Sequence, residues 1–369
     1  MEIKEKKGVR LKSLDALRGF DMLFIMGLAG WVISVCHLFP SCGAAEWLSA
    51  QMEHVDWNGL SHHDTIFPLF LFVAGISFPF SLAGQRANGK SSREIYCKII
   101  KRGLVLVILG VVYNGFFRFD FPAMRYASVL GRIGLAWMFA ALLFMNFRTK
   151  VCAILSAVIL IGYWLLLWLI PDAADPYSFG DNLVGAIDRA LLPGHLHNGT
   201  FDPEGILSTL PAIVTALLGM FTGRWVKLPQ EQVSGNRKVI YMLVASVLLI
   251  LAGWMWSYWF PVNKKLWTST FVCVVAGYSL LLFALFYYVI DVKGISRWSF
   301  FFRVVGLNSI TIYLAQRIID FGAVSDFFLV GIAGKFPEEV GNLINNTGYM
   351  AVCWLFLYFL YKKNIFLKV

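Results

Sequence analysis

Long apolar stretches alternate with short polar segments along the whole chain, and this pattern predicts helices that cross a membrane. About 20 apolar residues in helical conformation match the thickness of a bilayer's hydrocarbon core. Ten stretches are expected as spans, at residues 14–36, 60–84, 103–119, 127–147, 151–170, 206–225, 239–259, 267–290, 300–320 and 348–361. A further apolar stretch, 327–333, is too short to cross and is expected to be interfacial or re-entrant. The predicted fold is therefore all-α, a polytopic membrane helical bundle.

The distribution of charge orients this bundle. Most of the 32 Lys and Arg residues fall in the polar segments that share a side with the amino terminus, and cytoplasmic segments of membrane proteins carry such an excess. We therefore expect both termini to be cytoplasmic, and the net charge of +10 to reflect topology rather than nucleic-acid binding. Most carboxylates fall on the opposite side. This excess of carboxylates either favours a cationic ligand on that side or only reflects the preference of Lys and Arg for the cytoplasmic side.

Composition is typical of one membrane domain, over residues 1–369. Charged residues make up only 15% of the chain and apolar residues 58%, whereas a soluble domain carries about 25% charged residues. The first span is not followed by a small-residue cleavage site, so no removable signal peptide is expected. The six cysteines are scattered without a CxxC pair and predict neither a disulfide framework nor a zinc site.

The histidines are the first candidates for chemistry, because all six fall on the predicted non-cytoplasmic side. His54 opens a polar segment between the first two spans, and Asp64 follows in the first turns of the second. A carboxylate so close to hydrocarbon is expected to be paired or functional, so His54, His62 or His63 could act as a base and Asp64 as its orienting acid. His62 and His63 could complete a metal site, but the spacing matches no tight ligand motif and no metal is expected. Trp57 marks either the membrane interface or a surface on which a sugar ring stacks.

Three further groups of polar residues lie in or beside the spans. The turn Asp202-Pro203-Glu204-Gly205 presents two carboxylates to the compartment of His54, with helix capping as the alternative. Arg132 lies in the fourth span, where a guanidinium needs a partner and can bind a phosphate or a carboxylate. Asn308 and Ser309 lie in the ninth span, where hydrogen bonding between helices is the alternative to a role in binding.

Short blocks in a fixed order make the chain resemble a known family. The blocks are residues 10–19 (RLKSLDALRG), His54 with Trp57-Asn58-Gly59-Leu60, Asp64 with Phe67-Pro68, Leu130-Gly131-Arg132-Ile133-Gly134, Asp202-Pro203-Glu204-Gly205-Ile206-Leu207, Pro261-Val262-Asn263-Lys264 with Leu266-Trp267, Gly306-Leu307-Asn308-Ser309-Ile310 and Tyr361-Lys362-Lys363-Asn364-Ile365-Phe366. From about residue 10 to the end, their order resembles that of the heparan-alpha-glucosaminide N-acetyltransferase family of transmembrane acyltransferases.

The resemblance implies an enzyme that moves acetyl from cytosolic acetyl-CoA, its co-substrate, to the amino group of a terminal glucosamine across the membrane. The family's catalytic histidine precedes the Trp-Asn-Gly-Leu block and corresponds to His54. Residues expected on the sugar side are Trp57, Asn58, Asp202, Glu204, Asn263 and Lys264. Residues expected along the acetyl-CoA path are Arg132, Asn308, Ser309 and Arg18, with pairing to Asp15 as the alternative for Arg18.

The chain also departs from the family's lysosomal members. We expect it to lack their lumenal amino-terminal domain, and it has Ala29 where those members are expected to carry an Asn. These differences favour a bacterial inner-membrane enzyme whose site opens to the periplasm, with a homodimer left open. An amino-sugar permease is the alternative from another class, since ten spans and an acidic outer face also suit transport.

Overall fold

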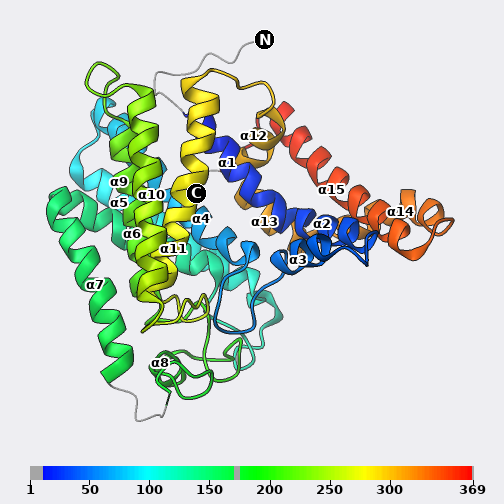
Figure 1. Ribbon diagram of the computed structural model, residues 1–369, viewed down its shortest axis with the longest axis horizontal. Helices are drawn as coiled ribbons and strands as arrows, with labels where there is room; N and C mark the ends of the chain where they lie inside the picture. Colours follow the sequence, from blue (N-terminus) through cyan, green and yellow to red (C-terminus); the bar gives the residue numbers. More distant parts are fainter. Residues whose placement is uncertain (1–10, 170–174, 368–369) are drawn as a thin grey trace.

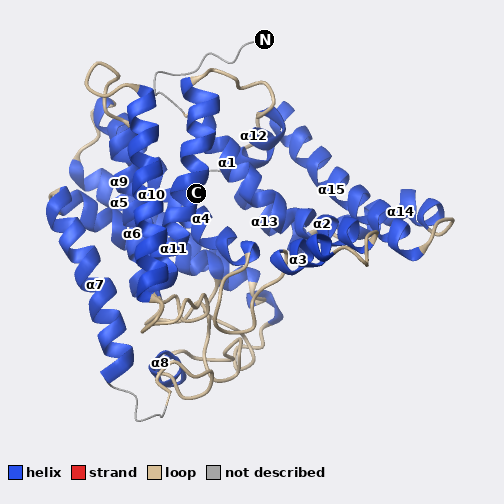
Figure 2. Cartoon of the chain, in the orientation of Figure 1, coloured by secondary structure: helices blue, strands red, loops and turns tan. Residues whose placement is uncertain are grey.

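The computed structural model describes residues 11–169 and 175–367. Within these segments all regular secondary structure is helical (Figure 2), as the sequence predicts. The α-helices are α1 (Lys12–Leu23), α2 (Ala29–His37), α3 (Gly43–Gln51), α4 (His62–Ala87), α5 (Ser92–Tyr113), α6 (Val129–Asn146), α7 (Thr149–Leu169), α8 (Leu183–Leu191), α9 (Thr209–Val226), α10 (Gly235–Trp256), α11 (Ser269–Tyr287), α12 (Phe300–Leu307), α13 (Ser309–Ile318), α14 (Phe321–Ala333) and α15 (Glu338–Lys362). A π-helical turn, Phe24–Leu28, joins α1 to α2, and another, Tyr288–Val292, extends α11.

Eight helices in the described part of the chain are long and apolar enough to cross a membrane. They are Lys12–His37 (α1 through α2), α4, α6, α7, α9, α10, Ser269–Val292 and α15. Each overlaps one of the predicted spans, although residue 170, the predicted end of the fifth, lies outside the described residues. The chain is therefore an integral membrane protein built as a helical bundle.

The predicted span at 103–119 is not among these eight helices. It belongs to α5, which ends at Tyr113 and carries Lys98, Lys101 and Arg102 in its first half. The part of α5 that follows these three cations, from Gly103 to Tyr113, is uncharged. It is shorter than the roughly 20 residues that a bilayer requires.

The predicted span at 300–320 is divided into two short helices, α12 and α13. The division falls at Asn308, whose backbone has φ −127° and ψ 30° and so leaves the helical region. The Asn308 amide donates a hydrogen bond to the carbonyl oxygen of Ile365 at 3.0 Å. Asn308 therefore joins the helix break to the chain's last turn instead of continuing one helix.

The bundle is centred on α4. This helix packs against α9, α11, α1 and α6, while α5 pairs with α6 and α10 with α11. Close approach of α4 and α9 depends on glycine, because a Cβ on Gly75 would overlap the backbone of Ala216 and one on Gly219 would overlap that of Phe72. The tight contact fixes α4, and with it the residues at the start of α4.

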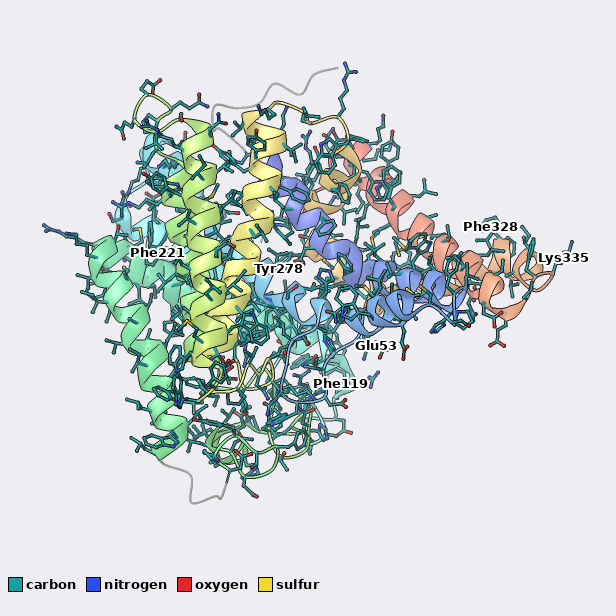
Figure 3. All side chains as sticks on the ribbon, viewed as in Figure 1. Glu53, Phe119, Phe221, Tyr278, Phe328 and Lys335 are labelled. Carbon is teal, nitrogen blue, oxygen red and sulfur yellow. The ribbon has the colours of Figure 1, made fainter. Side chains whose placement is uncertain are left out.

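A second group of helices packs on the other side of α1. Helix α12 lies against α1, α15 contacts α2 and α12, and α14 folds back on α15. Figure 1 shows α14 and the start of α15 projecting sideways from the bundle, and Figure 3 places Phe328 and Lys335 at that tip. Helix α14 is too short to cross a membrane, as predicted for the stretch 327–333.

Four connecting segments gather at one end of the bundle and form what we call the loop layer, residues 52–61, 114–128, 175–208 and 257–268 (Figure 1, bottom of the view). Hydrogen bonds tie these segments to one another. The Gly59 N–H donates to the carbonyl oxygen of Val262 at 2.8 Å, and the Trp57 indole donates to that of Tyr177 at 2.9 Å. The loop layer therefore covers the start of α4 with residues drawn from distant parts of the chain.

Candidate active site

A cavity of about 430 Å³ lies between the loop layer and the first turns of α4 and α6. It is lined by residues from the loop layer together with the π-helical turn Phe24–Leu28, α4, α6 and α13: Ile25, His54, Val55, Trp57, His63, Asp64, Ile66, Phe67, Arg125, Val129, His197, Asn198, Pro203, Glu204, Lys264, Lys265, Trp267 and Tyr313. Its volume is within the range of small-molecule sites, and half of the lining residues carry charged, imidazole or amide side chains. Of the predicted sugar-side residues, Trp57, Glu204 and Lys264 line it.

Asp64 is held by the start of α4. It is the third residue of the helix and forms a capping box with Ser61, whose N–H and hydroxyl donate to Oδ2 at 3.2 Å and 3.0 Å. This is the arrangement that satisfies free N–H groups at a helix amino terminus. The other oxygen, Oδ1, lies 2.7 Å from Nδ1 of His54. One carboxylate therefore caps a helix and orients an imidazole.

His54 is positioned for proton transfer or nucleophilic attack. Its side chain is 52% exposed whereas that of Asp64 is 1% exposed, so the imidazole reaches into the cavity from a fixed anchor. A hydrogen bond from Nδ1–H to the carboxylate leaves Nε2 as the basic nitrogen. The structure thus brings together the two residues that the sequence pairs as base and orienting acid.

Lys264 is a third member of this cluster. Its ammonium nitrogen lies 3.2 Å from Oδ1 of Asp64 and 3.1 Å from Nδ1 of His54. Because the two nitrogens converge on one oxygen, a protonated Nδ1 of His54 and the ammonium share the charge of Asp64. Burial lowers the pKa of Lys264, and the Asp64 carboxylate opposes that shift.

Asn263 and Asn58 support the cluster from behind and do not line the cavity. Asn263 is completely buried and its amide donates to Oδ1 of Asn58 at 3.1 Å. Its own Oδ1 accepts the N–H of Leu266 at 2.9 Å. The sequence predicts both asparagines as substrate-binding residues, but in the structure their polar groups hold the turn that carries Lys264.

The Asp202-Pro203-Glu204-Gly205 turn forms the opposite wall. Arg125 donates to both oxygens of Asp202, at 2.7 Å from Nε and 2.6 Å from Nη2, and also pairs with Glu204. Burial would raise the pKa of Asp202, but the hydrogen bonds and charge of Arg125 hold it below its usual range. Asp202 is fully buried. Asp202 does not line the cavity, whereas Glu204 and Arg125 do, and the role of Asp202 in binding substrate stays a prediction.

Helix capping does not explain this turn. Helix α9 begins only at Thr209, and its N-terminal cap position is Ser208. The turn is held instead by Asp188 of α8, which accepts the N–H groups of Asp202 and Ile206 at 3.1 Å and 3.0 Å. The carboxylates of the turn are thereby directed at Arg125 and the cavity.

Arg132 lies beneath this turn, close to the cavity but not in its lining. Its guanidinium is buried, sits 5.0 Å over the Trp267 ring, and donates to the Gly205 carbonyl at 3.3 Å and to the Ser208 hydroxyl. Its Nε and Nη1 have no hydrogen-bond partner among the described residues.

The predicted acetyl-CoA residues are not gathered in one site. Arg132 lies at the loop-layer end, whereas Arg18 donates to Ser77 at 3.0 Å far along α4 and pairs with Asp15 at 3.9 Å. Asn308 is bonded to Ile365 at the helix break. Ser309 lines a narrow apolar pocket of about 40 Å³. This pocket adjoins the main cavity, because Ile25, Phe67, Val129 and Tyr313 line both.

The sequence does not single out Arg125 and Tyr313 as site residues. Arg125 could have been found, since it is one of the few bases on the side where bases are scarce. His63 is among the histidines that the sequence offers as a base, although it lies outside the family blocks. No sequence pattern indicates that Tyr313 lines the cavity, because its position depends on the break between α12 and α13.

The chain is similar to known proteins along its whole length. Residues 10–254 match a family model described as heparan-alpha-glucosaminide N-acetyltransferase, catalytic. The heparan-alpha-glucosaminide N-acetyltransferase of Mus musculus is 25% identical, with 100% of this chain and 62% of that protein covered. That of Homo sapiens is 26% identical, with 98% and 60% covered. The chain thus spans about 60% of the length of these relatives. His54, Asp64, Arg125 and Glu204 lie within the matched region.

Proposed function

Because the chain belongs to the heparan-alpha-glucosaminide N-acetyltransferase family, we propose that it transfers an acetyl group from acetyl-CoA to the amino group of a glucosamine-type sugar. The observation that carries the proposal is the His54–Asp64 hydrogen bond of 2.7 Å at the wall of the cavity. Acyl transfer to an amine requires an oriented imidazole whose second nitrogen acts as base or nucleophile, and Nε2 of His54 has only the long 3.5 Å contact with the Lys264 ammonium.

Nε2 of His54 removes the proton from the sugar amine. The amine nitrogen attacks the acetyl carbonyl carbon, a C–N bond forms, the C–S bond breaks, and CoA leaves as its thiol after taking up one proton. In a second route the acetyl group passes first to Nε2 of His54 and then to the amine. Both routes use the same nitrogen, and in both Asp64 stabilises the charged imidazole.

The acceptor sugar would occupy the wider part of the cavity. Trp57 offers an aromatic face to a sugar ring, although its indole N–H is already donated to Tyr177. The Glu204 carboxylate on the opposite wall is a partner for a protonated amine or a sugar hydroxyl. These contacts favour a small polar acceptor carrying an amino group over an apolar one.

The acetyl-CoA donor would approach through the bundle from the end opposite the loop layer. On α1, Arg18 and Met22 share one face, because they are four residues apart, and Ile25 follows in the π-helical turn. Met22 and Ile25 line the narrow pocket beside the main cavity. The face that leads away from the cavity therefore ends at an arginine.

The neighbouring helices repeat this pattern. On α4, Phe70 lines the narrow pocket and Ser77, seven residues later, accepts the hydrogen bond from Arg18. On α6, Ile133 lines the pocket and Trp137 follows one turn later, with the Arg102 guanidinium 4.3 Å over its ring. Three helix faces thus run from the cavity to a pair of arginines.

Arg102 and Arg18 are suited to the phosphates of CoA. The two guanidiniums are close enough to repel one another, and Nε of Arg102 is buried without a hydrogen-bond partner among the described residues. An anion between them would relieve both conditions. Asp64 and Ser77 are separated by about 20 Å along α4, and the pantetheine arm of CoA reaches on the order of 15–20 Å.

We propose that the arginine end faces the cytoplasm and the cavity the opposite side, which in a bacterium is the periplasm, and the positive-inside bias supports this orientation. The test uses purified protein in sealed vesicles, with labelled acetyl-CoA on one side and glucosamine on the other. Label on the sugar supports the proposal. Accumulation of unmodified sugar without acetyl-CoA would support transport instead, a reading for which the relatives' names give no support.

A further inference from the structure

We propose that His63 is a further catalytic residue: a neutral imidazole that donates a hydrogen bond to the acetyl carbonyl oxygen as the acetyl group is transferred. The inference rests on the proposed function, since it assumes an acyl transfer beside His54. His63 lies outside the sequence blocks on which the family resemblance depends, so the resemblance assigns it no role.

The position of His63 meets the geometric requirement. It is the second residue of α4 and lines the same cavity as His54. The two imidazole rings lie 4.5 Å apart between centroids, at an angle of 58°. A carbonyl carbon in contact with Nε2 of His54 therefore carries its oxygen within hydrogen-bond reach of the second ring.

The protein itself does not use the polar groups of His63. Its Nδ1 is buried and has no hydrogen-bond partner among the described residues. The adjacent His62 differs, because its Nδ1 lies 3.0 Å from the Tyr278 hydroxyl and its ring packs against Phe24 at 4.5 Å. A buried polar group left unsatisfied is costly, and no contact in the described protein accounts for an imidazole at this position. Nε2, the other ring nitrogen, is the one available to donate into the cavity.

The surroundings of His63 keep the ring neutral. The amino terminus of α4 carries a positive partial charge, and Lys264 and His54 add positive charge on the cavity side. His62 is its neighbour on the same helix. Asp64, the remaining charged group facing it, already serves Ser61, His54 and Lys264. A neutral imidazole has one N–H to donate and polarises a carbonyl without giving up its proton.

The role of this donor is confined to the transition state. As the amine nitrogen bonds to the carbonyl carbon, the C=O electron pair moves onto oxygen, and the His63 N–H stabilises that oxyanion. When the C–S bond breaks, the pair returns to form the amide carbonyl and the hydrogen bond weakens. The amine proton goes to Nε2 of His54, and His63 keeps its own proton throughout.

The experiment compares His63→Leu with His63→Gln in the full-length protein. Glutamine keeps a neutral N–H donor and leucine does not. Loss of one such donor costs about 10²–10³ in kcat. We therefore expect His63→Leu to lose that factor with KM for both substrates within about threefold, and His63→Gln to lose tenfold or less. His62→Ala is the matched control, and thermal unfolding of each variant checks the fold.

The pH profile separates this role from that of a base. The acidic limb of kcat/KM should have the same midpoint in His63→Gln as in the unchanged protein. Equal losses in the leucine and glutamine variants, or a displaced acidic limb, would overturn the proposal. A lack of acetyl transfer by the unchanged protein would instead count against the proposed function.

Discussion

Nδ1 of His54 lies 2.7 Å from Oδ1 of Asp64, and that single contact joins a half-exposed imidazole to an almost completely buried carboxylate. The carboxylate cannot move, because its second oxygen caps α4 through Ser61. The imidazole is thereby held at the cavity wall. The stability of the start of α4 and the reactivity of His54 thus depend on one side chain.

Replacing Asp64 with Asn should remove activity without unfolding the protein. An amide at position 64 can donate to Nδ1 of His54, which would place the ring proton on Nε2 and leave no basic nitrogen in the cavity. The comparable change in a serine protease triad costs about 10⁴ in kcat. We expect a loss of 10³-fold or more in acetyl transfer, measured with labelled acetyl-CoA. Asp56→Asn, at an exposed neighbouring position, is the control and should remain active.

Replacing Lys264 with Met should slow acetyl transfer. The Lys264 ammonium lies 3.2 Å from Oδ1 of Asp64, the oxygen that orients His54. Without the ammonium, the buried carboxylate loses a charged partner, so we expect kcat to fall by about tenfold or more. Lys265→Met, which removes an ammonium bonded to the Asp56 carbonyl, serves as the control. Equal rates in the two variants would mean that the Lys264 ammonium has no role in the cluster.

Replacing Arg102 with Ala should weaken binding of acetyl-CoA and leave the acceptor unaffected. A charge-assisted contact with phosphate contributes about 1.5–3 kcal/mol, so KM for acetyl-CoA should rise by about 10- to 100-fold. KM for the sugar should stay within about threefold. The neighbouring exposed Lys101→Ala is the matched control on the same helix. Equal effects of the two substitutions would contradict a phosphate site at Arg102.

Most membrane-spanning helices could be predicted from the sequence, because a span is recognised by its mean hydropathy over about 20 residues. Eight predicted spans have counterparts among the described helices. The other two depend on finer features, the cations within α5 and the single residue at which α12 and α13 separate. Hydropathy averaged over a span does not show that one asparagine ends a helix. Asn308 does so, and its amide donates a hydrogen bond to the carbonyl of Ile365, 57 residues later.

The candidate site was predictable only where a residue's role is local. His54 and Asp64 are ten residues apart, and the helix start between them fixes their pairing. The arrangement around Arg125 could not be foreseen, because Arg125 meets Asp202 across 77 residues of chain. Asn263 is predicted from the sequence to bind substrate, but the structure shows it fully buried, where its side chain hydrogen-bonds within the turn that carries Lys264.

The Arg125–Asp202 pair should make the loop layer sensitive to acid. The pKa of Asp202 is held below its unfolded value of about 3.9, so the pair's stabilisation is complete above about pH 5 and is lost as the pH falls toward the folded pKa. Asp202→Asn should destabilise the protein by about 3 kcal/mol at pH 7, because a buried pair is broken. Its unfolding temperature should then depend less on pH between 5 and 3 than that of the unchanged protein.

The most direct measurement is acetyl transfer by purified protein carrying His54→Ala, beside the unchanged protein and His195→Ala. Each is incubated with acetyl-CoA and glucosamine, and N-acetylated sugar and free thiol are both quantified. We predict equal amounts of the two products from the unchanged protein and from His195→Ala, and a loss of at least 10³-fold from His54→Ala while thermal unfolding stays the same. Full acetyl transfer by His54→Ala would contradict the assignment of the site.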